Sequence, residues 1–141
     1  MSKRMLATLT AEHLVVLEMA DKVRTNLEKL QTDQDLTGVR DGLGQFSQIM
    51  DQTVNQHFVQ EEEELFPKLL KTNPNLNGEV EALLEDHKAI RQAHRSLQEE
   101  LLGDKPSPQI IVNSGLSLLD RLEAHFHREH QALSGLNDKK K

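Results

Sequence analysis

Residues 54–67 read VNQHFVQEEEELFP, and the expected fold is built outward from this stretch. His57 follows Val54 by three residues, and Glu61 follows His57 by four. These spacings share one face of an α-helix, so an apolar stripe would carry a histidine and a glutamate into the core. Upstream, the stripe consists of Val39, Leu43, Phe46 and Met50. The pattern predicts a helix over about 37–65, which Pro67 bends or ends.

The rest of the chain shows the same helical period. Further helices are predicted over about 10–30, 77–102 and 107–133, with Gly103 and Ser134-Gly135 as stops and Ser107-Pro108 as a start. Their inward apolar residues are expected to be Leu9, Val16, Leu17, Ala20, Val23, Leu27, Leu30, Val80, Leu83, Leu84, Ile90, Leu97, Leu101, Ile111, Leu118, Leu122, Phe126 and Leu133. No alternating segment indicates a strand. Four amphipathic helices with short links predict an all-α, up-down-up-down antiparallel four-helix bundle.

Composition excludes several classes of protein. The 141 residues suit a single domain, and the absence of Cys excludes disulfides and thiolate metal sites. A net charge of −6, with no Trp or Tyr, argues against a nucleic-acid partner. No apolar run approaches the roughly 20 residues that span a bilayer, and the first residues lack a signal peptide's apolar stretch. We therefore expect a cytoplasmic protein with no membrane or nucleic-acid partner. The unusual feature of the composition is the presence of seven histidines in a small acidic chain.

Extending each stripe by its own period brings polar residues inward on all four helices. The inward set is His13, His57 with Glu61, His87 with His94, and His125 with Glu129. In an antiparallel bundle, one histidine of each helix lies on the order of 5–15 Å from the same end, at 1.5 Å per residue. His94 lies about 10 Å along its helix from His87, so it is expected to be a core residue outside that level.

A group of buried ionisable side chains at one level needs a compensating partner. One inward histidine is usually a hydrogen-bonded core residue, and one His-x-x-x-Glu pair is often solvated. Together, however, four imidazoles and two carboxylates match a dinuclear carboxylate site in a helical bundle. The predicted metal ligands are His13, His57, Glu61, His87, His125 and Glu129. With an oxo or hydroxo bridge they fill about ten of roughly twelve octahedral positions, and N/O donors suit iron or manganese.

The same residues resemble the hemerythrin-like, HHE cation-binding family over about residues 9–133. The segment from His57 to Pro67 resembles the family's His-x-x-x-Glu-Glu and Leu-Phe-Pro pattern. Residues 85–91 resemble its third-helix motif, and residues 125–129 its fourth. The resemblance implies an up-down four-helix bundle with two non-haem iron ions. Glu61 and Glu129 would then bridge the ions, with the four histidines His13, His57, His87 and His125 as terminal ligands.

The chain also departs from the oxygen-carrying members of that family. They have a second third-helix histidine where this chain has Arg91, and a fourth-helix Asp where it has His130. The family's iron–sulfur repair proteins carry an N-terminal Cys-bearing segment, and this chain has no Cys. His130 could be a ligand only with a rotated fourth helix. His127 is expected to be solvated, and the run Glu62–Glu64 to be surface charge.

The sequence therefore predicts a di-iron protein that binds or senses oxygen or a related small species, such as nitric oxide or peroxide. A catalase-like or oxidase enzyme at the same centre is the alternative, and iron handling is a third possibility. The remaining possibility is a helical bundle that binds no metal and serves in interactions with other molecules. No nucleophile or acid/base set stands apart from the ligands, which argues against a hydrolase. The sequence identifies no protein partner.

Overall fold

The computed structural model describes the backbone of residues 3–138 and the side chains of residues 11–132, and this backbone contains no strand. Helix α1 spans Lys3–Asp33, α5 spans Asn77–Leu102 and α6 spans Pro108–Asp138. The second long helix joins α2 (Arg40–Ile49), the π-helical η1 (Met50–Val54), α3 (Asn55–Gln60), the π-helical η2 (Glu61–Leu65) and α4 (Phe66–Thr72). A 3₁₀ turn, η3 (Pro74–Leu76), leads into α5.

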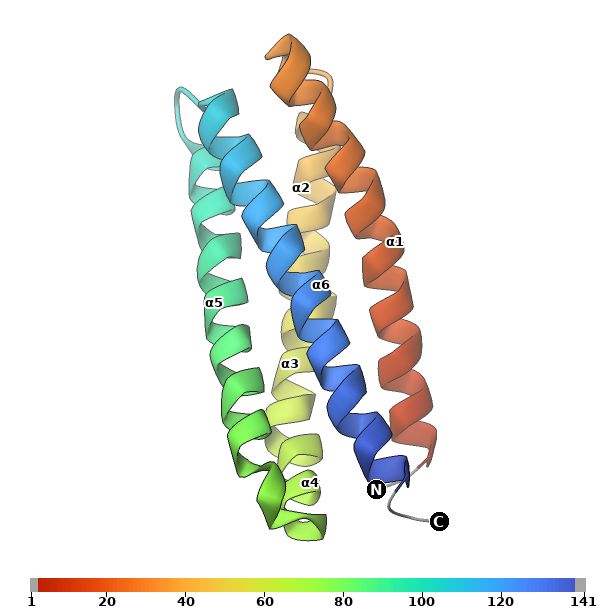
Figure 1. Cartoon of the computed structure of the whole chain (residues 1–141). Coiled ribbons are helices and arrows are strands. Elements are labelled where there is room, and N and C mark those ends of the chain that lie inside the picture. The colour runs from red at the N-terminus through yellow and green to blue at the C-terminus, as the bar shows by residue number, and fades with distance from the viewer. Residues whose placement is uncertain (1–2, 139–141) are drawn as a thin grey trace.

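The four long helices form an antiparallel bundle. Successive helices run in opposite directions, and α6 packs against both α1 and α5, as Figure 1 shows. The first and last described residues consequently lie at the same end of the bundle (Figure 1). The predicted all-α, up-down-up-down fold is confirmed. No described helix combines the length and the apolarity that crossing a membrane requires.

The predicted starts of the last two helices agree closely with the structure. Helix α5 begins at Asn77, and Gly103 follows its last residue. Helix α6 begins at Pro108, and the Ile110 N–H donates to the Ser107 hydroxyl at 3.3 Å. Ser107 is therefore the N-cap, because its oxygen satisfies a backbone N–H that has no partner within the helix.

Other predicted helix boundaries are wrong. The first helix begins at Lys3 and not at about residue 10. Ser134-Gly135 does not close α6, which continues to Asp138, because one Ser-Gly pair costs only about 1 kcal/mol of helix propensity. The second helix does not end at about residue 65 but continues through Pro67 to Thr72. Pro67 falls in the first turn after a π-helical segment, where the i→i−4 ladder is already interrupted, so its missing N–H is tolerated. The side chains of Leu9 and Leu133 lie outside those described.

The π-helical segment η2 follows from the spacing of buried residues in the second helix. His57, Glu61, Leu65 and Leu69 are successively four residues apart, and each is at most 4% exposed. In a regular α-helix each step of four turns the side chain about 40° away from the previous one. The wider turn of η2, in which the Phe66 N–H bonds the Glu61 carbonyl, removes this drift. All four side chains thereby stay on the inward face.

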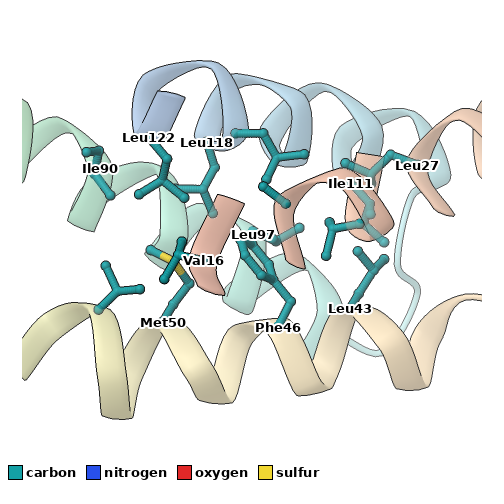
Figure 2. Packing of buried hydrophobic residues seen from close by; sticks show 14 of the residues in the cluster. Val16, Leu27, Leu43, Phe46, Met50, Ile90, Leu97, Ile111, Leu118 and Leu122 are labelled. Atoms are coloured by element: carbon teal, nitrogen blue, oxygen red, sulfur yellow. The ribbon is translucent and has the colours of Figure 1, made fainter. Parts of the chain in front are cut away.

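Two apolar clusters lie on either side of the inward polar residues. The larger draws on all four long helices (Figure 2), and the smaller joins α4 and η2 to the start of α5. The smaller cluster consists of Leu65, Phe66, Leu69, Val80 and Leu83. The predicted apolar positions with described side chains are buried, except Leu17 and Leu84, which are partly buried. The histidines and glutamates thus occupy one level between two dry layers.

Gly115 allows α6 to approach α1 closely. A Cβ at this position would lie 2.7 Å from Leu27 Cδ1, deep in the larger cluster. We expect Gly115→Ala to lower the free energy of unfolding by about 1–3 kcal/mol through overpacking. Chemical denaturation followed by circular dichroism measures this change.

Gly44 provides the matched control. It also lies inside a helix, and a Cβ there would meet nothing within 4 Å. Gly44→Ala should therefore raise the free energy of unfolding by up to about 1 kcal/mol, since only helix propensity changes. An equal gain for Gly115→Ala would show that the α1–α6 contact is looser than described.

Candidate metal centre

The structure brings all six predicted ligand residues together at the level between the two apolar clusters. His57, Glu61, His87, His125 and Glu129 are between 0% and 4% exposed, and the His13 side chain is 13% exposed. Their ligand atoms form two groups within 4.8 Å: His13, His57, Glu61 and Glu129 in one, and Glu61, His87 and His125 in the other. The histidines are thus divided into two pairs, one from α1 and α3 and the other from α5 and α6.

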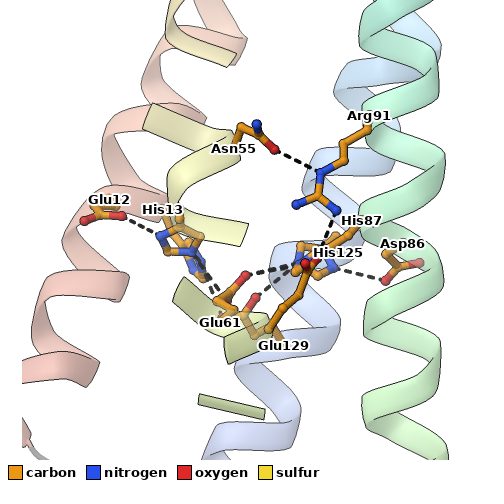
Figure 3. Close-up of polar contacts among 11 residues, drawn as sticks. Glu12, His13, Asn55, Glu61, Asp86, His87, Arg91, His125 and Glu129 are labelled. Carbon is orange, nitrogen blue, oxygen red and sulfur yellow. Dashed lines mark hydrogen bonds and ion pairs between the residues drawn. The ribbon is translucent and has the colours of Figure 1, made fainter. Parts of the chain in front are cut away.

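The two buried carboxylates lie between the histidine pairs, and each turns one oxygen toward each pair (Figure 3). Glu61 Oε2 is 3.4 Å from His57 Nε2, and Glu61 Oε1 is 3.1 Å from His87 Nε2. Glu129 Oε1 is 3.6 Å from His13 Nε2, and Glu129 Oε2 is 3.2 Å from His125 Nε2. This is the arrangement that two bridging carboxylates would adopt.

The ring nitrogens show that the centre needs positive charge. The His13 and His57 Nε2 atoms are 2.8 Å apart, and those of His87 and His125 are 3.1 Å apart. Where Nδ1 donates to a carboxylate, the Nε2 of a neutral imidazole presents a lone pair. Glu61 Oε2 and both Glu129 carboxylate oxygens are buried without a hydrogen-bond partner. A cation between these atoms would satisfy the lone pairs and the buried charge, so the residues fit a metal ion.

Without a cation, protons must take over part of this role. Burial disfavours the charged form of His125, but the nearby carboxylates of Glu129 and Glu61 outweigh it and raise the His125 pKa to about 9. Burial and the nearby Glu129 raise the pKa of Glu61 well above its usual value. Burial lowers the pKa of His13 to about 4, and burial together with His125 lowers that of His87 to about 4. His13 and His87 therefore stay neutral, as metal ligands must be.

Three further carboxylates hold the outward ring nitrogens of the histidines. Glu12 Oε2 lies 2.5 Å from His57 Nδ1, Glu62 Oε2 lies 2.6 Å from His87 Nδ1, and Asp86 Oδ2 lies 3.1 Å from His125 Nδ1. Such partners fix the ring orientation and raise ligand basicity in metal sites.

Sequence reasoning missed these three carboxylates, and it was wrong to assign Glu62 to the surface. Each acid is the chain neighbour of an inward residue of its own helix: Glu12 of His13, Glu62 of Glu61, and Asp86 of His87. Each nevertheless bonds a histidine of the next long helix along the chain. An acid beside an inward residue is a signal that could have been found. Its partner depends on how the helices pack.

Aromatic rings cover both histidine pairs. Phe58 is stacked on His87 with ring centroids 3.9 Å apart, and Phe126 is stacked on His13 at 4.2 Å. A shallow depression beside His13 and His57 has no room for a water molecule. Apolar residues Val16, Val54 and Phe126 form much of its wall. The centre is therefore shielded from bulk water.

The remaining histidines with described side chains lie outside both ligand groups. His94 is 7% exposed, and its Nε2 hydrogen-bonds the Ser47 hydroxyl at 2.9 Å. Its Nδ1 is 3.7 Å from Asp51, beyond hydrogen-bond distance, and Ser47 does not line the neighbouring 230 Å³ cavity. These three residues therefore do not form a nucleophile triad. His127 and His130 are exposed.

Comparison with known families agrees with this geometry. The family model described as "Hemerythrin HHE cation binding domain" matches residues 4–136, which include all six inward ligand candidates. No significant similarity to a curated protein or to a solved structure was found. The match spans nearly the whole chain, and its buried His and Glu groups could hold metal. The chain belongs to the hemerythrin HHE cation-binding domain family.

Proposed function

We propose that this protein holds two non-haem iron ions and uses them to bind or sense dioxygen or a related small species, such as nitric oxide or peroxide. The observation that supports the proposal most directly is the placement of the two oxygens of each buried carboxylate. Glu61 and Glu129 each turn one oxygen toward each of the two histidine pairs. One ion per pair, bridged by both carboxylates, matches this division of donors.

The donor set favours iron over a structural zinc ion. His13 and His57 would hold one ion, and His87 and His125 the other. Nitrogen and oxygen donors without any thiolate suit iron or manganese. When bound, an iron pair supplies one-electron redox chemistry and open coordination positions for a small molecule. An oxo or hydroxo bridge would complete the set.

The protein's own residues control what reaches the centre. Phe58 and Phe126 cover the imidazole rings, and the depression beside His13 and His57 has no room for a water molecule. These features keep bulky substrates and bulk water away from the centre. Glu12, Glu62 and Asp86 hold three of the four rings with Nε2 facing inward.

An enzyme at the same centre is the second candidate. Arg91 stands where the oxygen-carrying members of the family have a fifth histidine, so the donor set has one imidazole fewer. A free coordination position would support catalase-like or oxidase turnover. Iron handling is the third candidate, and it requires loosely held iron that chelators remove quickly.

Glu61 should be essential for metal retention. We expect Glu61→Ala to lose most of the iron, because this carboxylate contributes to both ligand groups. Metal analysis of purified protein measures the iron per chain, and circular dichroism checks that the bundle is intact. Glu63→Ala is the matched control, since Glu63 is an exposed carboxylate of the same η2 segment. Two retained irons in the Glu61 variant would contradict the bridging role.

Air exposure should separate the candidate functions. Iron-loaded protein is prepared without oxygen and then exposed to air while its absorption is recorded. The absence of Trp and Tyr keeps the protein background low, so bridged ferric bands in the near-ultraviolet and blue should be clear. Bands that disappear on deoxygenation and return on re-exposure support reversible binding. Bands that persist until a reductant is added favour a redox sensor, and steady peroxide consumption favours the enzyme.

His94 should not be needed for metal binding. We expect His94→Ala to keep the wild-type iron content, since its ring bonds Ser47 and lies outside both ligand groups. The free energy of unfolding should still fall by about 1–3 kcal/mol, because the buried Ser47 hydroxyl loses its partner. Metal analysis and denaturation of the same samples test both statements. Loss of one iron would place His94 in the centre.

A further inference from the structure

Arg91 closes a loop of four side chains around His87. Its Nη1 donates to Glu62 Oε2 at 3.0 Å, and the same oxygen lies 2.6 Å from His87 Nδ1. The Arg91 guanidinium also lies 5.6 Å from the centre of the Phe58 ring, which is stacked on the His87 imidazole. Its Nε donates to Asn55 Oδ1 at 2.9 Å, which fixes the direction of the guanidinium (Figure 3).

The other histidine of this pair has a similar arrangement. Asp86 lies beside His125 Nδ1, and Arg128 Nη1 donates to both Asp86 oxygens at 3.0 Å. The carboxylates on both rings of the α5–α6 pair are therefore held by an arginine. Among the described side chains, no arginine forms an ion pair with Glu12, the carboxylate beside His57. The two histidine pairs thus differ in their support although they share the same bridging carboxylates.

We propose that Arg91 is a positioning residue that holds His87 ready for metal before any metal binds. It acts through Glu62, which fixes the proton on Nδ1, and through Phe58, which fixes the plane of the ring. The Glu62 side chain is 26% exposed, so without Arg91 it could turn toward solvent and release the ring. The metal-binding part of this inference rests on the proposed function, whereas the ring orientation in metal-free protein does not.

Two opposite effects of the arginine must be compared. Its positive charge repels a metal cation, but the Glu62 charge 3.0 Å away largely cancels it at longer range. Loss of a partner that orients a ligand typically weakens metal binding 10–100-fold. Arg91 acts on the metal ligand through Glu62, so removal of Arg91 should weaken metal binding by a factor near the lower end of this range. We therefore expect the orienting effect of Arg91 on His87 to outweigh its repulsion of the metal ion. The Zn²⁺ dissociation rate tests this, because it should rise if orientation dominates and fall if repulsion dominates.

The test uses the full-length chain with Arg91→Met and Arg91→Lys. Arg95→Met is the matched control, because Arg95 is an exposed arginine one turn further along α5. In metal-free protein at neutral pH, ¹⁵N NMR of the imidazoles reports which His87 nitrogen carries the proton. Release of Zn²⁺ from loaded protein to a chelator then gives dissociation rates. Imidazole shifts assign each phase of release to a histidine pair.

We expect wild-type His87 to carry its proton on Nδ1, and Arg91→Met to give a mixture of both forms while His57 stays unchanged. Zn²⁺ should leave the His87/His125 pair about tenfold faster in this variant. Arg91→Lys should restore part of both properties, and Arg95→Met should match wild type. With Glu62→Gln as the background, Arg91→Met should add little, since both act through one contact.

Unchanged His87 protonation and Zn²⁺ release in Arg91→Met would overturn the inference, and slower release would show that charge repulsion dominates. Equal thermal midpoints for Arg91→Met and Arg95→Met exclude a general loss of structure. If wild-type protein binds no Zn²⁺ or iron, the proposed function fails. The NMR comparison in metal-free protein would still decide the role of Arg91.

Discussion

The burial of two carboxylates between apolar layers is the constraint on which the rest of this structure depends. Glu61 and Glu129 are 0% exposed, and three of their four oxygens have no hydrogen-bond partner. A buried ion costs several kcal/mol unless it is compensated. Four imidazoles surround the two carboxylates, and acidic side chains in turn hold three of these imidazoles. The whole cluster is organised around positive charge that protons supply only in part.

The local backbone serves the same requirement. Leu65 shares the inward face with His57 and Glu61 because η2 widens the turn between Glu61 and Leu65. Without it, successive side chains four residues apart would rotate out of the core. The same interruption of the hydrogen-bond ladder lets the helix pass Pro67 and add Leu69 to the apolar layer beyond. This irregular segment thus joins the buried carboxylate of Glu61 to the apolar layer beneath it.

The two histidine pairs offer the same ligand atoms, but among the described side chains they differ in the residues that hold the imidazole rings. His87 and His125 are fully buried, and arginines hold the carboxylates beside them. His13 is the most exposed of the four histidines, and it lies with His57 beside a depression that has no room for a water molecule. Among the described side chains, the carboxylates on the His87/His125 side are held by arginines, and Glu12 on the other side is not. Glu61 and Glu129 each contact both histidine pairs, so a shift of either carboxylate on one side would also move it relative to the other side.

The helical periods and the inward-facing positions of the histidines and glutamates were determined by the sequence alone. Each follows from the spacing of residues within one helix. Tertiary structure decided that His13 pairs with His57 and His87 with His125, and that Glu62 serves His87 across the bundle. It also decided the passage of the second helix through Pro67. These features depend on how each helix is rotated and set in depth against its neighbours, and no periodicity within a single helix contains that information.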